Sequence, residues 1–165
     1  MSIVIKPMET TEEVKGKAYV HYRAWQETYR GLVDPGFLDG RTLEMSERYA
    51  QRAFENGYPS LIAKDGEKVI GFADYGAYRG SDPANAGEVY AIYILKDYYD
   101  RGIGRALMQE ALSCIPADEP VIVWVLKGNE RAIRFYTRCG FRPDGVEQKI
   151  KLGTESVEIR MILNR

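Results

Sequence analysis

Two closely spaced glycines mark the part of the chain best suited to hold an anion. The segment Arg101-Gly102-Ile103-Gly104-Arg105 follows an apolar stretch and opens a helical pattern. The first backbone amides of a helix have no acceptor within the helix, and glycine lets a phosphate approach them closely. The flanking arginines add long-range attraction. We therefore predict that this segment binds a phosphate, and a purely structural turn is the alternative.

Two common phosphate loops do not fit this segment. A dinucleotide-binding fingerprint needs a third glycine three residues after the second, where the chain has Leu107. A P-loop needs Gly-Lys followed by Ser or Thr, and the sequence contains no such run. Since Gly-x-Gly alone is a weak signal, the identity of the phosphate has to come from another part of the chain.

A second motif lies in a predicted helix that begins at Asn129. Helical spacing puts Asn129, Ala132 and Tyr136 on one face, so that an amide, a small side chain and a phenol lie together. The two segments together resemble the GNAT superfamily of acetyl-CoA-dependent N-acetyltransferases. The first family signature, Q/R-x-x-G-x-G/A, has Tyr99 at its opening position here. The second, N-x-x-A-x-x-F/Y-Y-x-x-x-G-F, matches at Asn129, Ala132, Phe135, Tyr136, Gly140 and Phe141.

The resemblance implies that acetyl-CoA is the cofactor. Its pyrophosphate would lie on the amides of residues 101–105, near the positive end of the helix dipole. Its pantetheine arm would pair like an added strand with residues 90–94, and backbone groups near Tyr93 and Ile94 would hold the acetyl carbonyl. The cofactor-binding residues so implied are Ile92, Tyr93, Ile94, Arg101, Gly102, Ile103, Gly104, Arg105, Asn129 and Tyr136.

Two residues are predicted to move protons. The family signature makes Tyr136 the proton donor to the departing CoA sulfur. A free amine, with a pKa of about 8 to about 10.4, is mostly protonated near neutral pH and has to lose a proton before it attacks. Glu88 is the predicted base, because the two-residue alternation of a strand puts it on one face with Tyr90 and Ile92. The alternative for Glu88 is a surface carboxylate.

Aromatic residues are the candidates for binding the acceptor. Trp25 and Tyr29 lie on the first predicted helix, and with Tyr90 they offer cation-π contacts to an amine. Core packing is the alternative for at least one of them. His21, the only histidine, is expected to be structural, and no histidine follows Cys139 to activate it as a nucleophile. Acyl transfer is therefore expected to be direct.

Hydrophobic periodicity and turn residues give the order of the elements. Thr10 and Glu13 form a capping box, Thr42 caps a second helix, and Asp65-Gly66 is the turn of a hairpin. The predicted strands cover 3–6, 60–64, 68–73, 88–95, 121–126, 141–151 and 156–163, and the predicted helices cover 11–29, 42–54, 104–115 and 129–138.

This order is the order of the GNAT family. The resemblance implies a single domain over residues 1–165 with an α+β fold (an α/β three-layer arrangement). It also implies a mixed, mostly antiparallel sheet of about seven strands with four main helices. That sheet would be splayed between the fourth and fifth strands to admit the cofactor.

Composition restricts the partners. The 165 residues are 45% hydrophobic, which is enough for a sizeable core, and 23 basic against 24 acidic residues give a net charge of −1. We therefore expect no nucleic-acid or membrane partner. The sequence shows no signal peptide or membrane span, and its two cysteines, Cys114 and Cys139, are too few for a disulfide scaffold or a four-cysteine metal site. A cytoplasmic protein without a metal is expected.

The expected reaction is acetyl transfer from acetyl-CoA to a primary amine of a small molecule. Acetylation of a protein or peptide amine is the alternative within enzymes. A sensor domain that binds acyl-CoA without turnover is the alternative outside them. The resemblance also allows a homodimer.

Overall fold

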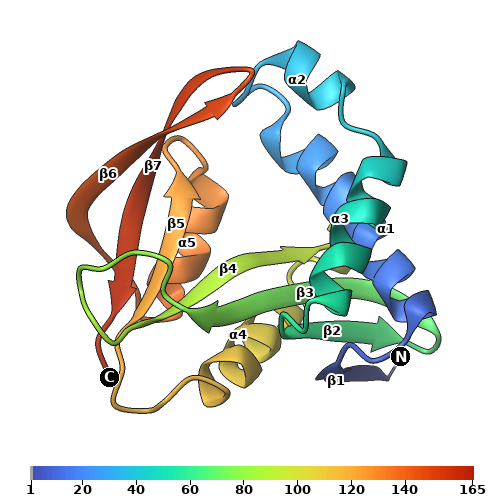
Figure 1. The fold of residues 1–165 in the computed structure, drawn as a ribbon, viewed down its shortest axis with the longest axis horizontal. Coiled ribbons are helices and arrows are strands. Elements are labelled where there is room, and N and C mark those ends of the chain that lie inside the picture. Colours follow the sequence, from blue (N-terminus) through green and yellow to red (C-terminus); the bar gives the residue numbers. More distant parts are fainter. Residues whose placement is uncertain (1) are drawn as a thin grey trace.

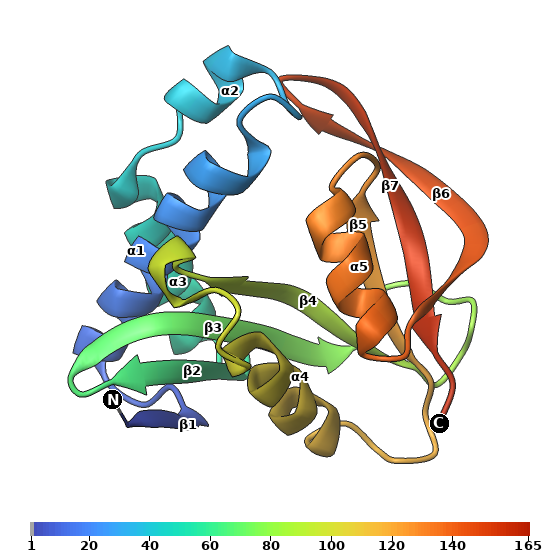
Figure 2. The ribbon, with the colours of Figure 1, turned by 180° about the vertical axis from the view of Figure 1, so that it is seen from behind.

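One seven-stranded sheet organises the chain, and the computed structural model describes residues 2–165 of it (Figures 1 and 2). The strands lie in the order β1-β2-β3-β4-β5-β7-β6. They are β1 (Ile3–Pro7), β2 (Ser60–Asp65), β3 (Lys68–Ala77), β4 (Gly87–Ile94), β5 (Val121–Leu126), β6 (Arg142–Leu152) and β7 (Thr154–Leu163). The helices are α1 (Thr11–Tyr29), α2 (Pro35–Asp39), α3 (Leu43–Glu55), α4 (Ile103–Ser113) and α5 (Glu130–Arg138), with a 3₁₀ turn η1 (Lys96–Tyr98).

The fourth and fifth strands diverge, as predicted. They form the only parallel pair of the described sheet, and they are paired only at Gly87 with Val121 and at Glu88 with Ile122. Beyond these residues β4 keeps β3 as its neighbour and β5 keeps β7. The mixed, mostly antiparallel, splayed sheet confirms the predicted fold class.

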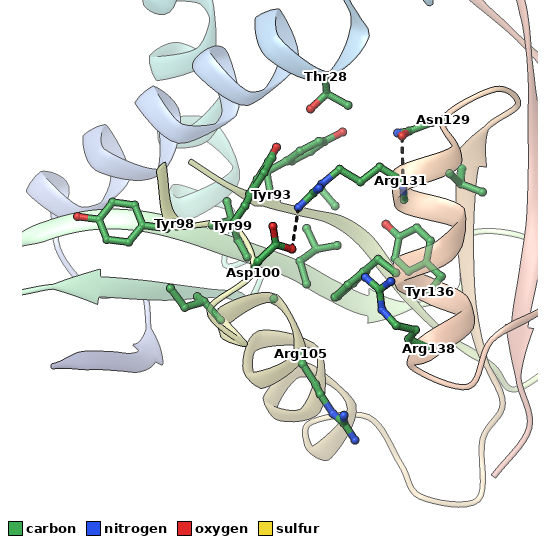
Figure 3. A pocket seen from close by; sticks show the side chains of 18 of the residues that line it. Thr28, Tyr93, Tyr98, Tyr99, Asp100, Arg105, Asn129, Arg131, Tyr136 and Arg138 are labelled. Carbon is green, nitrogen blue, oxygen red and sulfur yellow. Dashed lines mark hydrogen bonds and ion pairs between the residues drawn. The ribbon is translucent and has the colours of Figure 1, made fainter. Parts of the chain in front are cut away.

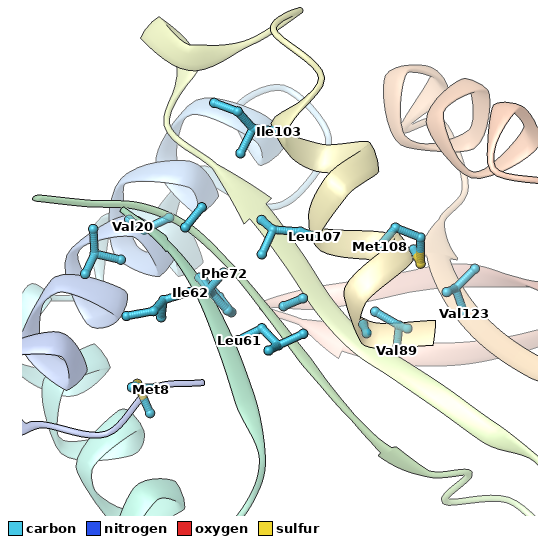
Figure 4. Packing of buried hydrophobic residues seen from close by; sticks show 14 of the residues in the cluster. Met8, Val20, Leu61, Ile62, Phe72, Val89, Ile103, Leu107, Met108 and Val123 are labelled. Carbon is cyan, nitrogen blue, oxygen red and sulfur yellow. The ribbon is translucent and has the colours of Figure 1, made fainter. Parts of the chain in front are cut away.

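Helices cover both faces of the sheet. His21 of α1 stacks on Tyr93 and meets Phe72 edge-on, whereas Leu107 of α4 lies against Gly71 and Ile94 on the opposite face. The larger core cluster follows from this arrangement (Figure 4). It joins α1, the central strands and α4 through fully buried side chains such as Val20, Ile62, Phe72, Leu107, Met108 and Val123.

A smaller apolar cluster closes the top of the molecule in Figure 1. Val33 and Leu38, from the chain between α1 and the end of α2, pack with Leu126 and Leu152. The turn between β6 and β7 is in tight contact with α2, because a Cβ at Gly153 would lie 2.8 Å from Phe37 Cβ and 2.9 Å from Asp34 Cβ. The hairpin and α2 therefore form an arch over the end of the splayed sheet.

The predicted capping residues are confirmed. Thr10 and Glu13 form a complete capping box at α1, and the Thr42 hydroxyl accepts the Met45 N–H at α3. Two short elements, α2 and η1, were not predicted. At α2, Asp34 accepts the Phe37 N–H at 2.9 Å and Pro35 occupies the first turn, and both features stabilise the start of this short helix.

Among residues 2–165, no helix combines the length and the apolar composition needed to cross a bilayer.

Glu13 gives the fold a pH-dependent contribution. Burial raises its pKa, but hydrogen bonds from Lys6 and from the Glu9 and Thr10 amides outweigh this effect and lower the pKa from 4.5 to about 2. A carboxylate with a depressed pKa stabilises the fold above its unfolded pKa and loses that effect as it protonates. The stability difference between the wild type and Glu13→Gln is therefore expected to be constant above about pH 5, with a pH-dependent part of at most about 3 kcal/mol. It should shrink as the pH falls from 4.5 towards 2. Urea unfolding at a series of pH values measures it, and a difference that does not change with pH would contradict this account.

Candidate active site

A cavity of about 230 Å³ lies where β4 and β5 diverge (Figure 3). The end of β4, the loop before α4, the first turn of α4, the end of β5 and one side of α5 form its walls. The residues that line it are Thr28, Tyr29, Tyr90, Ala91, Ile92, Tyr93, Ile94, Tyr98, Tyr99, Asp100, Gly102, Ile103, Gly104, Arg105, Trp124, Val125, Asn129, Arg131, Ala132, Phe135, Tyr136 and Arg138.

The start of α4 is the wall with free hydrogen-bond donors. The other four α-helices have a side-chain cap, supplied by Thr10, Asp34, Thr42 and Asn129, whereas Gly102 before α4 has none. Gly102 adopts a left-handed conformation with φ 76°, which favours glycine. The first amides of α4 are therefore left without a side-chain acceptor beside the cavity, and a phosphate group fits this arrangement.

Gly104 lets three elements come together at this point. A Cβ there would lie 3.1 Å from Ile94 of β4 and 3.1 Å from Phe135 of α5. Any larger residue would push α4 away from both. The two glycines of the motif thus have different roles, because Gly102 sets the backbone conformation and Gly104 allows close packing.

Positive charge surrounds the cavity. Arg105, Arg131 and Arg138 line it, and Asp100 is the only carboxylate among its lining residues. Arg131 reaches from α5 to the loop before α4, where its guanidinium lies 4.0 Å from the Tyr99 ring centroid and 3.6 Å from Asp100 Oδ1 (Figure 3). A guanidinium therefore stacks on the residue that replaces the Gln or Arg of the first signature. This charge balance suits a polyanion.

The free edge of β4 provides the second wall. Because Leu95 donates to Ile70, the alternation of an antiparallel ladder turns the backbone of Tyr93 towards β3 and the backbones of Ile92 and Ile94 away from it. Ile92 and Ile94 thus offer unpaired backbone groups to a strand-like ligand. Of the backbone groups predicted near Tyr93 and Ile94, those of Ile94 and Ile92 therefore face away from β3, whereas the backbone of Tyr93 faces β3.

Three tyrosines, Tyr29, Tyr93 and Tyr136, line the cavity. The Tyr29 and Tyr93 hydroxyl oxygens are 2.7 Å apart, and the Tyr136 hydroxyl points into the cavity from α5 (Figure 3). Burial raises the pKa of all three phenols. They are therefore protonated at neutral pH, and Tyr136 can act as a proton donor.

Glu88 lies outside the cavity lining. It is buried at the point where β4 and β5 part, and Arg79 holds it through a 2.6 Å ion pair and through the Arg79 backbone N–H. A β-bulge at Tyr90 breaks the two-residue alternation, since Tyr75 pairs with Val89 but Asp74 pairs with Ala91. The prediction that Glu88 shares a face with Ile92 is therefore wrong.

The predicted aromatic residues lie near the cavity in different ways. Tyr29 and Tyr90 line it, but the Tyr90 hydroxyl donates to the Ala77 carbonyl. Trp25 is the next ring beyond Tyr29, with the two ring centroids 4.6 Å apart. His21 packs against four aromatic rings, including Trp25 and Tyr93, and burial lowers its pKa to about 4. It is therefore neutral at pH 7 and has the structural contacts that we expected.

Of the ten predicted cofactor-binding residues, only Arg101 does not line the cavity, and its guanidinium instead lies 5.2 Å from the Tyr98 ring centroid. Sequence reasoning missed Arg131 and Arg138. Their spacing with Phe135, at i, i+4 and i+7, was the available signal. Among residues 2–165, no group of three or more His, Cys, Asp or Glu side chains is placed to hold a metal ion, and Cys114 and Cys139 are free thiols.

Comparison with known proteins gives consistent results. A model of the acetyltransferase (GNAT) family matches residues 16–141. The protein named Probable N-acetyltransferase Rv2775, from Mycobacterium tuberculosis, is 30% identical over 133 residues, which cover 78% of this chain and 74% of that protein. The uncharacterized N-acetyltransferase YuaI of Bacillus subtilis is 30% identical over 129 residues, covering 76% and 72%. The crystal structure of PaiA N-acetyltransferase from Thermoplasma acidophilum in complex with coenzyme A has a similar fold, with a TM-score of 0.73, 21% identity and full coverage of both chains.

Replacing Gly102 by valine is expected to abolish ligand binding at the start of α4, because a β-branched residue at φ 76° distorts the first turn. The measurement is the rise in melting temperature caused by acetyl-CoA, the cofactor that the sequence implies. Gly57→Val is the matched control, since Gly57 has φ 78°, has open space around its Cβ position and lies away from the cavity. Both variants should lose stability, but only Gly102→Val should lose the rise. An equal rise in both variants would place the phosphate site elsewhere.

Proposed function

This chain belongs to the GNAT family of acetyl-CoA-dependent acetyltransferases, and we propose that it transfers the acetyl group directly to a primary amine of a small molecule. The observation that carries the proposal is the uncapped start of α4, which faces a cavity rich in arginine where β4 leaves β5. Free amides, guanidinium groups and a free strand edge are the groups that would bind pyrophosphate and an amide-containing arm.

The residues present fit this cofactor. The amides of Ile103, Gly104 and Arg105 would hold the pyrophosphate, with Arg131 and Arg138 adding positive charge. The backbone groups of Ile92 and Ile94 that face away from β3 would pair with the pantetheine arm. Asn129 contributes less directly than its signature position implies, because its side chain accepts the Ala132 N–H and caps α5.

Tyr136 is the proposed proton donor. When bound, acetyl-CoA supplies a thioester whose carbonyl carbon an amine can attack, and the sulfur needs a proton as it leaves. The raised pKa keeps the Tyr136 phenol protonated, and its hydroxyl points into the cavity (Figure 3). One of the Tyr29 and Tyr93 hydroxyls donates to the other, whereas the Tyr136 hydroxyl donates to no group among residues 2–165.

Glu88 is the proposed base, acting through water. Its carboxylate is buried at the end of the splay and fixed by Arg79, so it does not itself reach the cavity lining. The Arg79 guanidinium also lies 4.7 Å from the Tyr90 ring centroid, and Tyr90 lines the cavity. A water held between Glu88 and the cavity would carry the proton from the amine.

The proposal of a small acceptor is supported by the arch over the splayed sheet. The β6–β7 turn touches α2 at Gly153, and side chains from both elements pack beneath the contact. An extended polypeptide could not cross the site at this end without opening the contact. Incubation with acetyl-CoA and a panel of amines and peptides, followed by a thiol assay for free CoA, tests turnover and acceptor size together. Release with peptides alone would contradict a small acceptor, and acetyl-CoA binding without release would contradict the enzyme.

Tyr136→Phe is expected to slow the chemical step by about a hundredfold or more, because it removes a general acid and leaves the ring packing in place. Single-turnover release of CoA measures this step, and calorimetry measures acetyl-CoA binding, which should stay close to the wild-type value. Tyr98→Phe is the control, since Tyr98 lines the cavity edge with its hydroxyl on Asp65. An unchanged chemical rate in Tyr136→Phe would assign the acid role to another group.

Glu88→Gln is expected to reduce kcat/KM for the amine by about a hundredfold. Circular dichroism and acetyl-CoA binding serve as controls for the fold. A normal rate would show that water or another residue takes the proton.

A further inference from the structure

Two charged side chains beside the aromatic residues of the site have no partner of opposite charge among residues 2–165. They are Arg41, in the connection between α2 and α3, and Glu158, in β7. Neighbouring charges are matched by ion pairs, as Arg79 with Glu88, Arg160 with Asp144, Arg30 with Asp39 and Lys17 with Asp74. A half-buried charge without a counterion raises the free energy of the folded protein unless a ligand supplies the counterion.

Arg41 lies against the aromatic residues of α1 and α2. Its guanidinium carbon is 4.6 Å from the Trp25 ring centroid and 5.6 Å from that of Phe37. These contacts fix the plane of the guanidinium but leave its N–H groups available. A guanidinium held in this way is suited to bind a carboxylate through two hydrogen bonds.

The indole N–H of Trp25, the ring on which Arg41 lies, is a second hydrogen-bond donor without a partner in the described part of the chain. This N–H is buried and lies towards the Tyr93 hydroxyl, yet it makes no hydrogen bond within the described residues. Buried indole N–H groups usually have a partner. An acceptor atom of a ligand would satisfy this donor.

Glu158 lies in β7, the neighbour of the strand that supplies Trp124 and Val125 to the cavity. It pairs across the sheet with Leu126, which packs in the cluster that also contains Trp25 and Tyr29. On the same face, Glu158 is diagonal to Trp124, which lines the cavity. Its carboxylate accepts a hydrogen bond from Gln148 at 3.0 Å and contributes to the electrostatic field at Tyr29 and Tyr136.

From these placements, we propose that the acceptor is a small aminocarboxylic acid, whose carboxylate binds Arg41 and whose ammonium group binds Glu158 before deprotonation. The rings of Trp25 and Tyr29 lie between the two charges, with their centroids 4.6 Å apart, and would cover the carbon skeleton of the acceptor. This inference rests on the proposed acetyl transfer to a small amine and adds the class of that amine.

Matched pairs of acceptors test the proposal. The pairs are glycine and glycinamide, β-alanine and β-alaninamide, and 4-aminobutanoate and 4-aminobutanamide, which vary the distance between the amine and the carboxylate. Release of CoA gives kcat/KM for each acceptor, expressed for the ammonium form that the proposal places at Glu158. For at least one pair, the acid is expected to exceed the amide by about tenfold or more, because a charge-assisted pair is lost in the amide.

Variants of Arg41 and Glu158 test which group of the acceptor each residue binds. Arg41→Gln is expected to lower kcat/KM for the acid to the level of its amide, whereas Arg48→Gln, on the exposed side of α3, should keep the preference for the acid. Glu158→Gln is expected to raise KM about tenfold for acid and amide alike, because both carry the ammonium group. Glu155→Gln, in the same strand with an exposed ion pair to Lys149, should change neither.

Equal use of acid and amide in every pair would overturn the proposal, as would a preference that persists in Arg41→Gln. The wild-type comparison decides the question even if Arg41→Gln does not fold. If no amine in any panel releases CoA, the proposed acetyl transfer itself fails, and that result differs from turnover without a preference.

Discussion

The site depends on the early separation of β4 from β5. The two strands are paired at only two positions, so the rest of β4 has a free edge inside the protein. Unpaired backbone groups there are costly unless a ligand pairs with them. The same separation admits the start of α4 and one side of α5 to the centre of the sheet. A strand edge, a helix start and a row of side chains therefore meet at one cavity, and none of them is available in a continuous sheet.

The cofactor side and the proposed acceptor side of the site differ in how their charges are arranged. On the cofactor side, charge accumulates, because an uncapped helix start and three arginines face one carboxylate. Such a field attracts any polyphosphate, and its strength depends little on the exact position of each arginine. On the proposed acceptor side, most charges are matched in pairs, and the recognition that we propose depends on Arg41 and Glu158, which are not. The net charge of −1 therefore says nothing about the acceptor, because it sums over pairs that cancel.

Much of this arrangement could be predicted from local sequence. Capping residues, hairpin turns and hydrophobic periods gave the four main helices and all seven strands, because each of these signals acts within a few residues. The confirmed capping box of Thr10 and Glu13 is the clearest case. The errors arose where one residue changes the geometry of its neighbours. The bulge at Tyr90 has no signature in the sequence, and it turned Glu88 and Ile92 to opposite faces.

The contact of Arg131 with Tyr99 shows why a motif can lose a residue and keep its chemistry. The first family signature has Gln or Arg where this chain has Tyr99, and the position alone would leave that side of the loop without a polar group. In three dimensions, a guanidinium from α5 stacks on this tyrosine, at 4.0 Å from the ring centroid. A residue far away in the sequence, Arg131, therefore supplies the positive charge beside Tyr99. The signature gives the residue type usual at this position, whereas the fold brings the Arg131 guanidinium to the same place from α5.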